Sequence, residues 1–283
     1  MNRQRTQNID CEAQKSRTCP SLLISTGSCY YLPGDEMVDV INNTGADGIE
    51  LLIGPELEMS TQSDIVKWFG YYEGIVHLHA PFGLGVHPGN RDHLCVETTI
   101  RIARSLNAGL LVIHPPLAPE RFSAIESLRA VTSALCEALG DSCRITIENM
   151  PLPTDPWKRM YDCITGMDEL AQLAQQLGLG LTFDVAHLAT RGNSLIPTHR
   201  EYRDLISNVH LSDYASGKQH LAPGEGELPL ADYLNFVGSL DPAPCITLEL
   251  SPRHFNKPPA APLTETLRRA LDFTRLCVTQ GTM

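Results

Sequence analysis

The chain has 283 residues, of which 42% are hydrophobic and 19% are charged, the composition of an ordinary globular protein. No apolar stretch approaches the roughly 18 to 20 residues that cross a bilayer, and the basic, polar N-terminus lacks the apolar segment of a secretory signal. The formal net charge of −11 disfavours broad adhesion to nucleic acid, although it leaves room for a local basic groove. Nine scattered cysteines without a C-x-x-C pair are typical of reduced thiols, so we expect a cytoplasmic protein.

The predicted elements alternate between strand and helix along the chain. Residues 1–20 form a polar tail, and residues 21–283 form one domain with apolar residues at helical spacing between short apolar runs. Three of these helical segments run over residues 125–139, 170–177 and 263–271. The β-branched, apolar runs predict strands at residues 22–25, 48–53, 75–79, 110–114, 144–148, 181–184, 209–211 and 246–250.

Eight strands that alternate with helices predict a parallel sheet, which closes most naturally into a single (β/α)₈ TIM barrel, an α/β fold. The structural alternative is an open, doubly wound sheet. That fold usually carries a glycine-rich G-x-G-x-x-G turn after its first strand, and the run LLISTGSCYYLPGD lacks it. We therefore expect the barrel.

Histidine, aspartate and glutamate residues stand at the ends of the predicted strands. The carboxyl ends of barrel strands meet at one mouth, where catalytic residues lie, so these side chains should converge. Carboxylates crowded there without lysine or arginine would repel one another unless cations were bound. Imidazole and carboxylate ligands suit Zn²⁺, Mn²⁺ or Fe²⁺, and we expect one to three divalent ions, Zn²⁺ or Mn²⁺ before others. The candidate metal ligands are His79, His114, Glu148, Asp184, His187, His210, His220 and Glu249.

Several motifs carry a resemblance to a known family. They are HLHAPFG, VIHPP, TIENMP, TFDVAHLA, VHLSD, HLAPGEGEL and TLEL, spread from residue 77 to residue 250. The chain resembles the xylose isomerase-like TIM-barrel superfamily, which contains endonuclease IV, the family-2 apurinic endonucleases and the sugar (phosphate) isomerases and epimerases.

The endonuclease pattern implies three metal positions. It implies a first metal on His79, His114 and Glu148, and a second on Glu148, Asp184, His210 and Glu249. A third would take His187, His220 and an aspartate two residues before His220, where this chain has Lys218. Because the ammonium group of Lys218 cannot bind a metal ion, the third metal site lacks one of its expected ligands. Lys218 is then a candidate to contact a substrate phosphate. The isomerase pattern implies one metal on Glu148, Asp184, His210 and Glu249.

Two enzymatic functions remain after this comparison. A two-metal hydrolase uses His79 and His114, whereas a one-metal isomerase has no need for both, which favours hydrolysis of a phosphoester or phosphodiester. The substrate would be a small phosphorylated molecule such as a nucleotide, a sugar phosphate or a cobamide. The alternative is a sugar (phosphate) isomerase or epimerase that uses Glu148 and Glu249 as acid and base. A third hypothesis is a barrel without catalysis that senses a sugar or a metal.

Other residues receive secondary roles. Lys218, Arg253 and Glu50 are predicted to contact substrate, and Asp213 is predicted to orient His210 or a neighbouring ligand. Of the two histidines in the third strand, we choose His79 as the ligand because it stands at the strand end, and expect His77 to face the other way. Phe82 is more plausible as a loop aromatic that covers the site than as a wedge for a bent duplex. The sequence is compatible with a monomer or a homodimer.

Overall fold

A computed structural model describes residues 19–54, 62–81, 84, 90–116, 118, 120–153, 164 and 166–281. The predicted tail, apart from its last two residues, lies outside the described residues, as does Phe82. In the described ranges, no helix is both long and apolar enough to cross a membrane.

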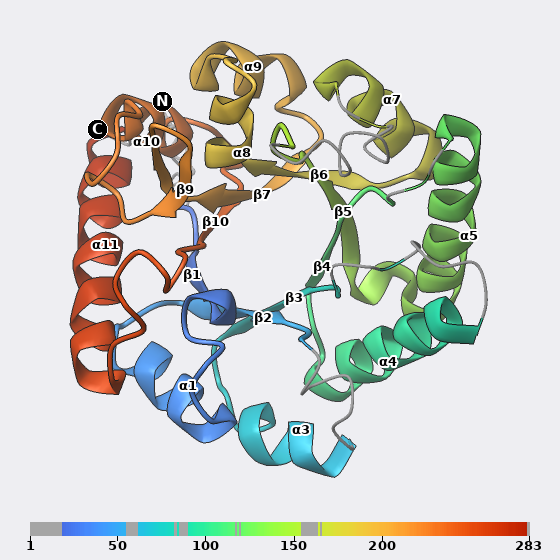
Figure 1. The fold of residues 1–283 in the computed structure, drawn as a ribbon, viewed down its shortest axis with the longest axis horizontal. Coiled ribbons are helices and arrows are strands. Elements are labelled where there is room, and N and C mark those ends of the chain that lie inside the picture. Colours follow the sequence, from blue (N-terminus) through green and yellow to red (C-terminus); the bar gives the residue numbers. More distant parts are fainter. Residues whose placement is uncertain are drawn as a thin grey trace, which may run out of the picture.

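Eight parallel strands close into one barrel, which confirms the predicted fold (Figure 1). Around the barrel each strand pairs with two neighbours, and the order is β1-β10-β7-β6-β5-β4-β3-β2. The predicted strands match the observed ones to within a few residues. Their bounds are β1 Leu22–Ser25, β2 Gly48–Leu52, β3 Ile75–His79, β4 Leu110–Ile113, β5 Arg144–Glu148, β6 Gly180–Asp184, β7 Ile206–Leu211 and β10 Cys245–Leu248.

Helices surround the barrel and bury its outer face (Figure 1). Leu22 and Ile24 of β1 belong to the same buried apolar cluster as Leu267 and Leu271 of the last helix. Each fully buried leucine or isoleucine contributes about 1.5–3 kcal/mol to stability, so this layer between sheet and helices is the main core. The helices are α1 Gly34–Asn42, α3 Gln62–Phe69, α4 Asn90–Leu106, α5 Arg121–Leu139, α7 Met167–Leu177, α8 Val185–Thr190, α9 Leu195–Tyr202, α10 Leu230–Gly238 and α11 Ala260–Gly281, with 3-10 turns η1 Thr26–Ser28 and η2 Gly140–Ser142.

The barrel interior is polar, in contrast to its outer face. Glu50 of β2 bonds across the barrel to Asn208 of β7 and Thr247 of β10, and Thr146 of β5 bonds to Thr182 of β6. All five side chains are buried. Because side chains alternate between the two faces of a strand, the ligand residues at the strand ends point into this same interior.

A small antiparallel hairpin follows β7 at the barrel mouth. It consists of β8 Asp213–Ala215 and β9 Lys218–Leu221. Ser216 and Gly217 between them have φ of 49° and 82°, the pair of positive angles that favours a tight two-residue hairpin turn. This hairpin, which was not among the strands predicted from the sequence, carries His220.

Candidate metal centre

Four strand ends bring one ligand atom each to a common point in the barrel mouth. Nδ1 of His210 lies 3.0 Å from Glu249 Oε2, 3.3 Å from Glu148 Oε1 and 3.9 Å from Asp184 Oδ2. The ligand atoms of these four residues all lie within 4.8 Å of one another. Ligands on one tetrahedral ion with bonds near 2.1 Å stand about 3.4 Å apart, so separations of 3.0–3.9 Å match a shared ion.

These same four atoms lack hydrogen-bond partners. In the described part of the chain, Glu148 Oε1, Asp184 Oδ2, His210 Nδ1 and Glu249 Oε2 are buried without one. Buried polar atoms in native proteins are nearly always paired, and buried carboxylates are costly to leave uncompensated. A divalent cation would satisfy all four at once, so the residues fit a metal ion. We name Glu148, Asp184, His210 and Glu249 the core cluster.

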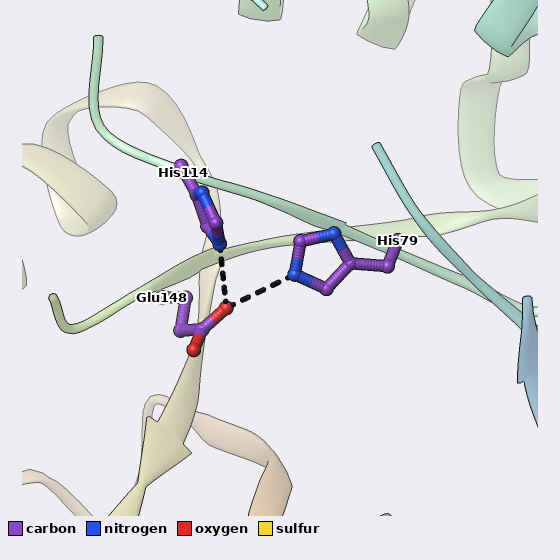
Figure 2. A group of neighbouring side chains, drawn as sticks. All are labelled: His79, His114 and Glu148. Carbon is purple, nitrogen blue, oxygen red and sulfur yellow. Dashed lines mark hydrogen bonds and ion pairs between the residues drawn. The ribbon is translucent and has the colours of Figure 1, made fainter. Parts of the chain in front are cut away.

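A second cluster shares Glu148 with the core cluster. Nε2 of His79 lies 3.2 Å from Glu148 Oε2, and Nε2 of His114 lies 3.1 Å from the same oxygen. Figure 2 shows both rings directing a nitrogen at that oxygen from different strands. Since Oε1 belongs to the core cluster and Oε2 to the histidine pair, Glu148 is placed to bridge two ions.

A third cluster consists of Asp184, His187 and His220. His187 is the third residue of α8. The side chain of the N-cap residue Asp184 accepts the His187 backbone N–H at 2.6 Å. The Nε2 atoms of His187 and His220 are 3.2 Å apart. This is again the separation of two ligands on one ion, formed without an aspartate at position 218.

In His79, His187 and His220, the ring nitrogen Nδ1 faces a backbone carbonyl oxygen. Nδ1 of His79 lies 2.9 Å from the Ala80 carbonyl, Nδ1 of His187 3.0 Å from the Asn149 carbonyl, and Nδ1 of His220 3.2 Å from the Glu249 carbonyl. Donation from Nδ1 leaves the Nε2 lone pair free toward the cluster. Such anchoring of the second nitrogen is the usual support of a metal-binding histidine.

Asn149 is a supporting residue that the sequence analysis missed. Its side-chain amide donates to the Asp184 carbonyl at 2.9 Å, and its side-chain oxygen accepts the Asp184 backbone N–H at 2.8 Å. With the carbonyl contact to His187, Asn149 fixes the path of two ligands. The available signal was its position directly after Glu148 at a strand end.

Opposite charges govern the ionisation of the site. Burial would raise the pKa of Glu148, but the imidazoles of His210 and His114 hold this pKa well below its ordinary value. Burial would lower the pKa of His187, but the carboxylates of Asp184 and Glu148 raise it to about 9. Burial would likewise lower the pKa of His210, but the carboxylates of Glu50, Glu148 and Glu249 raise it well above its ordinary value. For His114, burial prevails and lowers the pKa. A metal ion that binds to His187 and His210 would therefore displace protons.

Glu50 and Asp213 have structural roles, and the role predicted for Glu50 is wrong. Glu50 is fully buried beneath His210, with its Oε1 2.9 Å from His210 Nε2, so it cannot reach substrate. Asp213, predicted to orient His210 or a neighbouring ligand, accepts backbone N–H groups of Tyr214, Gly224, Gly226 and Leu228. It therefore organises the segment after His220.

The expected orientation of His77 is wrong. Residues two apart in a strand share a face, so His77 and His79 both point into the barrel, and both are buried. His77 pairs in register with Glu50, one layer below the ligands.

The two predicted cationic substrate contacts lie at the rim. Lys218 is exposed at the start of β9, and Arg253 is exposed in the segment after β10. Within the described residues, no hydrogen bond or ion pair joins Lys218 or Arg253 to the three clusters. Their contact with substrate stays a prediction.

Several known proteins are similar to this chain in sequence or in fold. An uncharacterized protein of Mycobacterium leprae is 27% identical over 260 residues, covering 81% of this chain and 88% of that protein. A D-tagatose 3-epimerase-like structure has a TM-score of 0.68 at 20% identity, covering 90% of this chain and 98% of the other. The IolI protein, solved with a zinc atom, has a TM-score of 0.70 at 14% identity, with coverage of 90% and 98%. A family-2 AP endonuclease from Brucella melitensis has a TM-score of 0.67 at 14% identity, with coverage of 83% and 94%.

These structural similarities, all below 25% identity, concern the fold. The family model described as "Xylose isomerase-like TIM barrel" matches residues 38–277, which include all eight candidate ligands. The chain therefore belongs to the xylose isomerase-like TIM barrel family.

Proposed function

We propose that the protein is a metal-dependent hydrolase that cleaves a phosphoester or phosphodiester of a small phosphorylated substrate. The observation that carries the proposal is the bridging position of Glu148, with one oxygen in the core cluster and the other 3.1–3.2 Å from His114 and His79. Two bound ions would supply Lewis-acid stabilisation of the charge that develops on phosphoryl oxygens and would make water a nucleophile at neutral pH.

The exposure of the ligands indicates where a substrate would enter. The side chains of His114, His220 and Glu249 are 13%, 23% and 14% exposed, whereas those of Glu148, Asp184 and His210 are at most 1% exposed. The three partly exposed groups therefore line the approach, and Glu249 is the carboxylate placed to give or take a proton at the reacting atoms. The buried groups hold the geometry.

The substrate class follows from charge. Acidic side chains exceed basic ones by 33 to 22, which disfavours a nucleic acid polyanion. A nucleotide, a sugar phosphate or a cobamide presents a single phosphoester with few further charges. Lys218 and Arg253 at the rim are the candidate contacts for the rest of such a molecule.

A second candidate is a sugar (phosphate) isomerase or epimerase. The core cluster is complete by itself, with Glu148 Oε1 and Glu249 Oε2 3.3 and 3.0 Å from His210 Nδ1, which gives two carboxylates for an acid and base pair around one ion. The similarity to the D-tagatose 3-epimerase-like structure supports this candidate. A one-metal isomerase or epimerase would leave His79 and His114 without a role in metal binding.

A substrate panel separates the two candidates. Protein loaded with Zn²⁺ or Mn²⁺ is incubated with phosphomonoesters, phosphodiesters and free ketoses. Glu148→Gln is the inactive control. Glu36→Gln, a change at an exposed residue of α1, is the active control. We expect phosphoester hydrolysis that Glu148→Gln reduces at least about 100-fold. Turnover of ketoses without any phosphoester hydrolysis would refute the proposed reaction.

A further inference from the structure

A buried carboxylate below the core cluster belongs to none of the metal clusters. Glu50 of β2 is fully buried and reaches across the barrel to β7 and β10. Its oxygens lie 2.9 and 3.1 Å from His210 Nε2, and its Oε2 accepts from Asn208 Nδ2 at 3.0 Å and from Thr247 Oγ1 at 3.3 Å. Asn208 and Thr247 donate to Oε2, and His210 Nε2 is the further polar atom that faces the two oxygens.

These contacts determine which nitrogen of His210 can bind a metal. A neutral imidazole carries one proton, and an ionised carboxylate only accepts hydrogen bonds. With Glu50 at Nε2, the proton stays on Nε2, and the lone pair of Nδ1 faces Glu148 Oε1 and Glu249 Oε2. In the opposite tautomer the unprotonated Nε2 would face a Glu50 oxygen, so two acceptors would be in contact. The proton on Nδ1 would then occupy the lone pair that His210 directs at the core cluster.

The hydrogen bonds that Asn208 and Thr247 donate to Glu50 Oε2 favour a carboxylate over an amide at position 50. Thr247 Oγ1 is also 3.2 Å from Asn208 Oδ1, so the hydroxyl and the amide are tied to each other as well as to Glu50. A glutamine at position 50 would place its NH₂ group against Asn208 Nδ2 or against His210 Nε2, since the Thr247 hydroxyl alone can also accept. One contact would then join two donors, and His210 could relieve it by moving its proton to Nδ1.

Other ligands use a different support. The second nitrogens of His79 and His220 face backbone carbonyls, which are neutral. Glu50 places a formal negative charge behind the imidazole at the centre of the core cluster. A carboxylate at this position orients the ring and raises the basicity of the ligating nitrogen.

We propose that Glu50 is a positioning residue of the metal centre, which holds His210 in the tautomer that binds a divalent ion and strengthens the core cluster toward it. The proposal rests on the metal-binding part of the proposed function, which the hydrolase and the isomerase share. It does not depend on which reaction follows.

Zinc affinity without substrate tests the proposal. Zn²⁺ is titrated against a competing chelator into the wild type, Glu50→Gln and Thr182→Val. Thr182 is a matched control because it is equally buried in the barrel interior and bonds to Thr146. We expect Glu50→Gln to weaken the tightest site by about 10- to 100-fold, and Thr182→Val to stay within about twofold of the wild type. Equal affinity of Glu50→Gln and the wild type would overturn the proposal.

The tautomer of His210 gives a second readout, which does not depend on a folded variant. Nitrogen-15 NMR of histidine in the zinc-saturated wild type should show the His210 proton on Nε2. A proton on Nδ1 would overturn the proposal even if Glu50→Gln failed to fold. Because neither measurement uses substrate, an enzyme inactive on phosphoesters would leave both readouts intact.

Discussion

Glu148 stands at the end of β5 with its two oxygens directed at different neighbours. One oxygen lies 3.3 Å from His210 Nδ1, and the other lies 3.1 Å from His114 Nε2. A carboxylate can bridge two cations because each oxygen retains lone pairs for a separate partner. The number of ions, and with it the choice of reaction, therefore depends on whether the histidines beyond Glu148 act as ligands.

Replacement of His114 distinguishes the two reactions. In a hydrolase, His114→Ala removes a ligand of the second ion, so we expect activity to fall by at least about 100-fold and metal content to fall by one ion per chain. In a one-metal isomerase, the core cluster would stay whole. The measurement is kcat/KM together with elemental analysis, and unchanged metal content in His114→Ala would contradict the two-ion assignment.

His199 of α9 is a buried histidine outside the metal centre. Its Nδ1 lies 2.8 Å from the Tyr233 hydroxyl, and burial, assisted by Arg203, lowers its pKa to about 4 from an ordinary 6.5. The unfolded chain thus binds a proton between pH 6.5 and pH 4 that the folded chain excludes. This contribution to stability is complete above pH 6.5 and is lost as the pH falls toward 4, with a magnitude on the order of 3 kcal/mol.

The prediction is a difference in slope. Thermal unfolding midpoints of the wild type should fall more steeply from pH 6.5 to pH 4.5 than those of His199→Phe, which cannot take up the proton. Parallel curves for the two proteins would show that His199 does not stay neutral in the folded state.

At the scale of elements, the β8-β9 hairpin positions His220. The carboxylate of Asp213 accepts backbone N–H groups of Gly224, Gly226 and Leu228 at 2.9–3.1 Å and so holds the segment that follows β9. A side chain at position 226 would collide with Asp213, so the glycine there is needed for the close approach. The third cluster depends on this folded segment.

Asp213→Asn should therefore affect the third cluster selectively. An amide offers one acceptor oxygen in place of two, so we expect faster hydrogen exchange over residues 222–228 and weaker metal binding by His187 and His220. The core cluster should keep its affinity, since β5, β6 and β10 are unchanged. Weakening of the core cluster to the same degree would contradict this separation.

The same scale shows what could be predicted from the sequence. The apolar runs gave the eight strands, and ligand residues such as His79 and Asp184 stood out because polar groups ended those runs. Glu50 was predicted to contact substrate but lies against His210, because contacts across a barrel depend on three-dimensional distance and leave no periodic signal. The hairpin was missed because its strands have only three and four residues.

At the scale of the whole molecule, two kinds of interior coexist. An apolar layer between strands and helices supplies the stability, whereas the barrel interior concentrates carboxylates and imidazoles. Bound cations would pair with the buried carboxylate oxygens that lack a hydrogen-bond partner among the described residues. Bound ions should therefore stabilise the entire barrel.

Chelation tests this coupling. A ligand present at about 100 times its Kd adds about 2.7 kcal/mol of stability, which for a chain of 283 residues shifts the unfolding midpoint by roughly 5 °C. We expect EDTA to lower Tm by this amount and Zn²⁺ or Mn²⁺ to restore it. A Tm that is insensitive to both treatments would contradict a contribution of metal to folding.

The most direct test of the central claim is the metal content of the protein purified without chelator, measured by elemental analysis and native mass spectrometry. The bridging position of Glu148 predicts at least two divalent ions per chain. A single ion that does not increase with added Zn²⁺ or Mn²⁺ would contradict the bridged centre, and a protein without any ion that takes up neither metal would contradict the metal centre itself.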